Sequence, residues 1–141
     1  MSIEANKAVA RRYFDDYLAH KGVGGDDLFG ENYQFYNPIV PDPLNLRAYH
    51  DFTVKFFGAF PDARFRVEDV IAEGDKVVTR YTLRATQTGP WISDIPVTGK
   101  PFTIQGFEIH RIADGRIVEQ WSLFDLAGTL RQLGVFPPPG E

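Results

Sequence analysis

The hydrophobic period of the sequence changes at Pro61, and this change constrains the fold more than any other feature. Before Pro61, apolar residues recur at helical spacing, which predicts helices over residues 2–20 and 45–61. After it, apolar and polar residues alternate in four segments joined in two places by Gly-Asp or Asp-Gly turns. These segments predict strands over residues 63–74, 76–88, 101–113 and 116–125. The order predicts an α+β fold, in which a curved antiparallel sheet packs against N-terminal helices and a short helix over residues 126–134 closes the chain.

Length and composition limit the class of protein. The 141 residues favour one domain over residues 1–141, with a tail over residues 136–141. The net charge of −4 and the lack of a basic tract exclude a nucleic-acid-binding footprint. Cysteine is absent, which excludes a disulfide framework and a thiolate nucleophile. Charges interrupt the N-terminal segment every few residues, so we expect no signal peptide and no membrane span, but a soluble, cytoplasmic protein.

The last predicted strand carries two carboxylates on its tryptophan-bearing face. Strict alternation puts Glu119, Trp121 and Asp125 on one side of the strand, together with Ile117 and Leu123. An acid in an apolar setting must be paired, neutral or chemically useful. This face therefore supplies the first candidates for a functional site.

Five segments, in order, resemble the SnoaL-like polyketide cyclase family, within the nuclear-transport-factor-2-like (NTF2-like) superfamily. They are "NKAVARRYF", "FYNP", "AFPDARFRVEDVIAEGDKVVTRYTLRATQTG", "IPVTGKPFTIQGFEIHRIADGRIVEQW" and "DLAGTLRQLG". The resemblance implies a cone-shaped fold whose mouth opens to a largely apolar pocket between the sheet and the helices. It also implies a small hydrophobic ligand and a homodimer formed through the outer face of the sheet. The superfamily hosts several reactions and also binding proteins, so the resemblance does not fix the function.

Asp125 is the first choice for a catalytic residue. The resemblance places it where cyclases of the family keep an acid/base aspartate. It implies a cofactor-independent enzyme that acts on a hydrophobic, polyketide-like carbonyl compound by aldol-type cyclisation or proton-transfer isomerisation. From the residues, burial against Trp121 would raise the pKa of Asp125, which could then take a proton beside a ketone and return one to oxygen. The alternative is structural, because Asp125 precedes the last predicted helix and could cap it.

The strand over residues 101–113 has two faces of different character. Gln105 and Phe107 lie on one face, and Glu108 and His110 lie on the other. If the more apolar face points inward, Gln105 faces the pocket and can orient a carbonyl group. His110 then lies on the outer face, near the expected dimer interface. The alternative is an inward His110 that donates a hydrogen bond to a substrate or relays a proton.

Several tyrosines and one asparagine could contact a ligand. Tyr36 and Asn37 end an extended segment over residues 32–38, where they could hydrogen-bond a ligand, although Asn-Pro is also ordinary turn chemistry. Tyr17 and Tyr81 could present hydroxyl groups to a cavity, although core aromatic residues with one polar tip are common.

The two tryptophans and Glu119 complete the candidates. We expect Trp121 and Trp91 to shape the pocket. Trp91 lies in an unusually apolar connection that could close over the cavity or cover a partner subunit. Glu119 could pair with Arg111 or Arg80 on a neighbouring strand, or act as a second catalytic carboxylate.

Two other functions stay open at this stage. One is a non-catalytic small-molecule-binding protein in which Asp125 only caps a helix. The other is an epoxide-hydrolase-like enzyme in which Asp125, Glu119 and an arginine hold a water molecule. The three histidines lack metal-ligand spacing, and no phosphate- or dinucleotide-binding motif is present, so we expect no metal and no cofactor.

Overall fold

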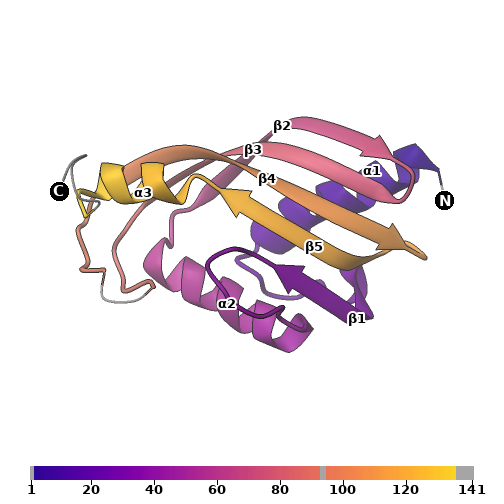
Figure 1. The fold of residues 1–141 in the computed structure, drawn as a ribbon, viewed down its shortest axis with the longest axis horizontal. Coiled ribbons are helices and arrows are strands. Elements are labelled where there is room, and N and C mark those ends of the chain that lie inside the picture. Colours follow the sequence, from indigo (N-terminus) through magenta and orange to yellow (C-terminus); the bar gives the residue numbers. More distant parts are fainter. Residues whose placement is uncertain (1, 93–94, 136–141) are drawn as a thin grey trace.

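The computed structural model describes residues 2–92 and 95–135, in which helices pack against a five-stranded sheet (Figure 1). The α+β fold, the predicted helices and the four predicted strands are confirmed. The predicted tail over residues 136–141 lies outside the described residues. The elements, in order, are α1 (Ile3–Arg12), η1 (Tyr13–Leu18), η2 (Asp26–Leu28), β1 (Phe29–Tyr36), α2 (Leu46–Ala59), β2 (Arg64–Glu73), β3 (Lys76–Thr86), β4 (Pro101–Ala113), β5 (Arg116–Phe124) and α3 (Leu126–Leu133).

Side-chain caps fix where the first two α-helices begin. The Ser2 hydroxyl accepts a hydrogen bond from the N–H of Ala5 (3.0 Å), and Oδ1 of Asn45 accepts one from the N–H of Ala48 (2.9 Å). Such caps satisfy backbone donors that have no partner in the first turn, and each contributes about 1 kcal/mol. After Arg12 the first helix continues as the π-helical segment η1, which turns four side chains into the core.

The strand order of the sheet is β1-β5-β4-β3-β2. Strands β2 to β5 form an antiparallel meander, whereas β1 pairs with β5 in parallel, so the sheet is mixed rather than wholly antiparallel. The long connection between β1 and β5 makes the parallel pairing possible. The β4–β5 hairpin turns at Asp114 and Gly115, whose φ values of 52° and 75° are those that a tight two-residue hairpin requires.

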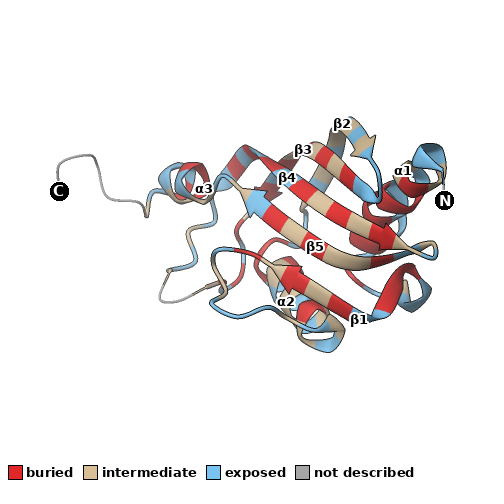
Figure 2. Ribbon diagram, turned by 45° about the vertical axis from the view of Figure 1, so that its right-hand side comes forward, coloured by how far each residue is buried: buried red, intermediate tan, exposed pale blue. Residues whose placement is uncertain are grey.

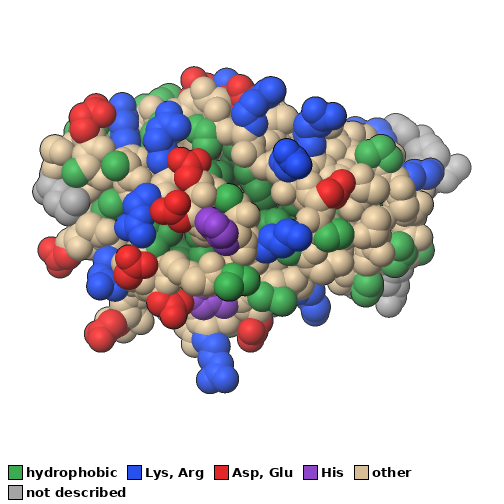
Figure 3. Space-filling view, turned by 180° about the vertical axis from the view of Figure 1, so that it is seen from behind, with side chains coloured by type: hydrophobic (Ala, Val, Ile, Leu, Met, Phe, Trp, Pro, Cys, Tyr) green, Lys and Arg blue, Asp and Glu red, His purple; other side chains and the backbone are tan. Residues whose placement is uncertain are grey.

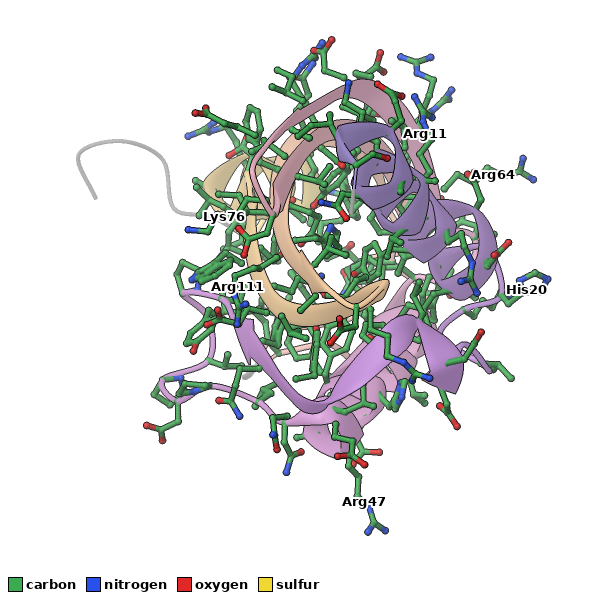
Figure 4. All side chains as sticks on the ribbon, turned by 90° about the vertical axis from the view of Figure 1, so that its right-hand side faces the viewer. Arg11, His20, Arg47, Arg64, Lys76 and Arg111 are labelled. Atoms are coloured by element: carbon green, nitrogen blue, oxygen red, sulfur yellow. The ribbon has the colours of Figure 1, made fainter. Side chains whose placement is uncertain are left out.

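The curved sheet wraps around an aromatic interior, and α1 and α2 close its open side (Figure 4). Buried residues alternate with half-buried or exposed ones along β3, β4 and β5, as Figure 2 shows. This alternation means that one face of the sheet belongs to the core and the other faces outward. Within the described residues, no helix has the length and apolar character needed to cross a bilayer.

A bulge in β5 changes which residues share a face. Arg111 of β4 pairs with Glu119, whereas the next residue of β4 pairs with Ile117, so Val118 is an extra residue in β5. Ile117 is completely buried, but Glu119 and Trp121 are half-buried on the outer face. The prediction that Ile117 and Trp121 share a face is therefore wrong, because the bulge shifts the alternation by one residue.

Candidate functional site

A cavity lies between the inner face of the sheet and the helices. Its volume is about 60 Å³, which gives room for a few water molecules. A cavity that admits benzene needs about 150 Å³, so an organic ligand must displace side chains such as the half-buried Phe52 and Phe56. The lining is mostly aromatic and aliphatic, with few polar groups. It consists of Tyr13, Leu18, Phe35, Tyr49, Phe52, Thr53, Phe56, Phe65, Tyr81, Leu83, Glu108, Ser122 and Phe124.

Glu108 on β4 is the acidic residue of this lining, and no Lys or Arg accompanies it there. Its side chain is held by β5, since Oε2 accepts a hydrogen bond from Nε2 of Gln120 (3.0 Å) and Oε1 accepts one from Oγ of Ser122 (3.0 Å). Burial raises the pKa of Glu108 from 4.5 to about 8, and these two hydrogen bonds oppose the rise only in part. Glu108 is therefore mainly a neutral acid at pH 7, with a pKa close to the pH at which general acids and bases work best.

The orientation of Gln120 is fixed from its other side. The hydroxyl of Tyr33 donates to Oε1 of Gln120 (2.6 Å), so the amide nitrogen must face Glu108. Gln120 is 0% exposed and Tyr33 is 1% exposed. Burial raises the pKa of Tyr33 well above 10, so its hydroxyl stays protonated and keeps donating. The chain of three side chains holds the carboxyl group of Glu108 in one place.

The inward face of β4 is the opposite of the predicted one. Glu108 and His110 point into the core, whereas Gln105 and Phe107 are exposed on the outer face. The predicted orientations of Gln105 toward the pocket and of His110 toward the outer face are therefore wrong. The physical reason is that β5 offers Glu108 two hydrogen-bond donors, so a polar side chain can be buried there.

His110 is a neutral ring in the core behind the cavity. It is 0% exposed, and neither ring nitrogen has a hydrogen-bond partner among the described residues. Its ring packs against that of Tyr13, with the two centroids 4.6 Å apart. Burial lowers the pKa of His110 from 6.5 to about 3, which the neighbouring Gln120 side chain opposes only in part.

The inner tyrosines stay protonated over the physiological pH range. Tyr13 and Tyr49 line the cavity and hydrogen-bond each other through their hydroxyl groups. Tyr17 lies outside the lining, where its hydroxyl hydrogen-bonds Nδ1 of His50 (2.8 Å), and burial raises its pKa to about 12. Burial also raises the pKa values of Tyr13, Tyr49 and Tyr81 well above 10. Tyr81 lines the cavity, which is the position that the sequence suggested.

Asp125 caps helix α3. Its Oδ1 accepts a hydrogen bond from the N–H of Gly128 (2.8 Å), which is the structural role that the sequence left open. Asp125 is exposed and does not belong to the cavity lining, so the expected burial of its carboxylate against Trp121 is not found. An acid/base role in the cavity would require this side chain to leave its cap, at a cost of about 1 kcal/mol.

Three further candidates meet outside the cavity. The rings of Tyr36 and Trp121 stack on the outer face of the sheet with centroids 5.4 Å apart, and Glu119 pairs there with Arg111 at 2.5 Å. Tyr36 and Trp121 border a separate surface hollow with Asn37. The side chain of Asn37 accepts a backbone N–H two residues further on (2.9 Å), which is the turn chemistry that the sequence also allowed.

The arrangement that an epoxide hydrolase would need is not formed by these residues. Arg80 pairs with Asp69 (2.6 Å), and Arg111 pairs with Glu119, all on the outer face. Figure 4 shows Arg111 near Lys76 at the periphery of the molecule. Figure 3, which views the molecule from behind relative to Figure 1, shows charges of both signs mixed on that side. In the described part of the chain, no three His, Cys, Asp or Glu side chains gather as a metal ion would require.

Trp91 lies one layer behind the cavity. It is buried against Phe60, with ring centroids 5.0 Å apart, and against Phe124, at 6.1 Å, and Phe124 belongs to the lining. The connection that carries Trp91 is held by Gln87, whose amide donates to the carbonyl oxygen of Pro96 (3.1 Å). Trp91 therefore supports the wall of the cavity through Phe124.

Sequence reasoning missed the polar centre made by Glu108 and its partners. A signal was present, because Glu108 and His110 on one strand match Ser122 and Gln120 on the next, each pair spaced by two residues. Polar side chains at matching positions of adjacent strands are typical of a buried hydrogen-bonded network as well as of a solvated face. The apolar residues between them favoured the second interpretation.

The mixed, curved five-stranded sheet with helices packed against it is an NTF2-like α+β fold. A family model described as SnoaL-like polyketide cyclase matches residues 7–133, and the chain belongs to this family. The chain matches no curated protein.

Solved structures share the fold over nearly the whole chain. One is IdmH from Streptomyces antibioticus, provisionally assigned as a polyketide cyclase, at 25% identity and a TM-score of 0.80, covering 92% of this chain and 99% of that one. Another, from Jannaschia sp. CCS1, is provisionally assigned as a SnoaL-like polyketide cyclase, at 23% identity, a TM-score of 0.85 and coverage of 98% and 97%. AclR from Streptomyces galilaeus, provisionally assigned as a hydroxylase, has 24% identity, a TM-score of 0.83 and coverage of 96% and 100%. Proteins with this fold are thus named for different reactions, so the chemistry of this chain has to be inferred from the residues of its own site.

Proposed function

We propose that this protein is a cofactor-independent enzyme that transfers a proton on a neutral, hydrophobic carbonyl substrate, with Glu108 as the acid/base. One observation carries the proposal: Glu108 is a buried carboxyl group in the cavity wall, has no cation beside it in the lining, and has a pKa of about 8. A purely structural carboxylate is usually paired or solvated, because an isolated buried charge is costly. A group balanced between its two protonation states suits proton transfer.

The chemistry follows from the two states of Glu108. Its carboxylate takes a proton from the carbon next to a carbonyl group, which leaves an enolate and the neutral acid. In a cyclisation, the enolate carbon then attacks a second carbonyl of the same molecule and closes a ring. In an isomerisation, a conjugated enolate is instead reprotonated at a different carbon. In both cases the acid returns the proton, to the new alkoxide oxygen in the first case and to carbon in the second. No atom or electron is left over, so no cofactor is needed.

The lining also limits the substrate. No described lining residue carries a positive charge, so a carboxylate or phosphate on the buried part of a substrate would have no partner. The aromatic walls favour a flat, unsaturated body such as a polyketide-like chain or ring. The small volume means that binding opens the cavity by moving rim side chains.

The test is hydrogen–deuterium exchange at the carbon next to the carbonyl of a hydrophobic ketone, 2-tetralone, followed by NMR in D2O. Wild-type protein should accelerate this exchange, and the rate should rise as pH approaches 8 because more Glu108 is ionised. Glu108→Gln should lower the accelerated rate about 10²–10⁴-fold, since general acid–base catalysis contributes about that much.

Asp125→Asn is the matched control for this experiment. Asn keeps the cap of α3 but cannot act as an acid or base, so its rate should equal that of wild type. If Asp125→Asn lost the exchange and Glu108→Gln kept it, the acid/base would be Asp125. If neither wild type nor any variant accelerated the exchange, the protein would be a non-catalytic small-molecule-binding protein. This second candidate function is favoured by the hydrogen bond with which Asp125 caps α3.

We also propose that two copies of the chain associate through the outer face of the sheet. The pairing register aligns Ile71, Val78, Ile109, Trp121 and Tyr36 in one apolar row across all five strands. Beside this row, Phe107 pairs with Leu123, and these two side chains are 46% and 58% exposed. An apolar patch of this kind on a sheet is typical of an interface, and a second copy would cover it with the same surface.

Leu123→Arg should therefore convert a dimer into a monomer in sedimentation experiments, because it would place a cation within the patch on both copies. Val54→Arg adds the same charge at an apolar residue of α2 that is 59% exposed, and it should leave the dimer intact. A monomeric wild type, or a Leu123→Arg variant that stays dimeric, would contradict this interface.

A further inference from the structure

We propose that the hydroxyl group of Tyr81 donates a hydrogen bond to the substrate's carbonyl oxygen, and that Gly106 is the positioning residue that gives this hydroxyl its place. The inference rests on the proposed function, because it assigns the donor that stabilises an enolate oxygen while Glu108 moves the proton. Such a donor is needed because negative charge develops on oxygen as the proton leaves carbon.

Gly106 and Tyr81 are paired residues of neighbouring strands, and the tyrosine lies over the glycine. A Cβ atom at position 106 would lie 2.3 Å from Oη and 2.5 Å from Cζ of Tyr81. It would also lie 3.1 Å from the carbonyl oxygen of Leu123. Any side chain at position 106 would therefore push the phenol out of its place. The backbone of Gly106 does not need a left-handed conformation, so the close approach of the phenol is what requires glycine here.

The hydroxyl of Tyr81 differs from those of the other inner tyrosines. Tyr13 and Tyr49 bond each other, Tyr33 donates to a glutamine and Tyr17 bonds a histidine. Tyr81 has no hydrogen-bond partner among the described residues, although the side chain is only 3% exposed and lines the cavity. The Tyr81 oxygen is not one of the completely buried polar atoms that lack a partner, so it is open to the cavity, where a ligand can supply the acceptor.

The surroundings hold the phenol rigid and protonated. Its ring packs against Phe65, with centroids 5.3 Å apart, and against Phe14, at 5.7 Å. Burial, with the nearby Glu108 and Tyr49, raises the pKa of Tyr81 well above 10, so it remains a donor whenever Glu108 titrates. Glu108 lies on the same inward face of β4 as Gly106, two residues further on. A donor and a proton acceptor thus line the same cavity, and enolisation needs both groups.

The test uses 4-nitrophenol as a probe, because its phenolate resembles an enolate oxygen and its absorbance reports ionisation. We would measure the pKa of the bound probe in the Glu108→Gln variant, where the carboxyl group no longer titrates. Adding Tyr81→Phe should raise the pKa of the bound probe by about 1–2 units, because a hydrogen bond to the phenolate is lost. Adding Tyr36→Phe instead removes a hydroxyl on the outer face and should leave this pKa unchanged.

Gly106→Ala in the same background should raise the probe's pKa as Tyr81→Phe does, although Tyr81 is still present. A merely structural role of Gly106 would change stability but not this spectroscopic shift. An unchanged pKa on Tyr81→Phe, or failure of 4-nitrophenol to bind at all, would overturn the assignment. Because the background lacks the Glu108 carboxyl group, this result is independent of the exchange experiment, and either proposal can fail without the other.

Discussion

The free energy of unfolding of Glu108→Gln should rise steadily relative to that of wild type as the pH increases from 4.5 to 8. In the folded protein Glu108 keeps its proton up to about pH 8, whereas in the unfolded chain it loses the proton near pH 4.5. Within this window the native state binds more protons, so the free energy of unfolding of wild type falls as the pH rises. The fall is about 1.4 kcal/mol per pH unit, or about 4–5 kcal/mol across the window.

No neighbouring charge is available to offset this loss. The titratable groups whose charges interact with that of Glu108 include Tyr13, Tyr33, Tyr49 and Tyr81, and burial keeps all four neutral throughout this range. Gln120 and Ser122 only donate hydrogen bonds to it. The full cost of ionising a buried carboxyl group therefore appears in the stability of the protein.

Urea unfolding at a series of pH values between 5 and 8.5 would measure the effect. The difference between Glu108→Gln and wild type is the quantity of interest, since other titrating groups cancel in it. Glu31→Gln, at an exposed residue of β1, serves as a control and should run parallel to wild type. Parallel curves for Glu108→Gln and wild type would mean that Glu108 titrates as in water, and the acid/base proposal would lose its basis.

The fold could be predicted because local signals agree with the tertiary structure. The change of period at Pro61 and the Asp-Gly turn at Asp114 each depend on neighbouring residues, and both are confirmed. The parallel pairing of β1 with β5 was missed because it joins distant segments. The bulge at Val118 was missed for a similar reason, since it is a property of the pairing between β4 and β5.

The site could be predicted only in part, because its chemistry depends on which face of β4 is inside. Hydropathy favours the face of Phe107 and Ile109, and that choice put Gln105 in the pocket. The burial of Glu108 depends on donors from Gln120 and Ser122 across the sheet, which no property of β4 alone can reveal. Tyr81 lies in the cavity lining, whereas its neighbours Arg80 and Thr82 lie on the other face of β3.

Variants that lack His110 should gain stability relative to wild type as the pH falls, whereas Glu108→Gln gains as the pH rises. The imidazole stays neutral in the folded protein down to about pH 3, whereas in the unfolded chain it binds a proton below pH 6.5. The unfolded state then binds more protons, so wild type loses about 4–5 kcal/mol of stability through this residue between pH 6.5 and 3. Variants without a titrating group at position 110 should lack this loss.

Two substitutions make the measurement independent of packing. His110→Phe keeps an aromatic contact with Tyr13 but adds volume, and His110→Asn leaves a small void. The free energies of unfolding of the two variants will differ. Relative to wild type, however, both should increase by the same amount per pH unit as the pH falls below 6.5. Urea unfolding from pH 7 down to 4 would show it.

The two slopes together distinguish a neutral pair from an ion pair. Glu108 and His110 lie on the same inward face of β4, and in the neutral arrangement an acid keeps its proton while the imidazole lacks one. If they formed a carboxylate–imidazolium pair, attraction would lower the pKa of Glu108 and raise that of His110. Wild type would then gain stability relative to Glu108→Gln as the pH rises toward 4.5, and it would lose stability relative to the His110 variants as the pH rises above 6.5. Slopes of this opposite sign, outside the two pH windows given above, would contradict the neutral core and the raised pKa of Glu108 on which the proposed proton transfer rests.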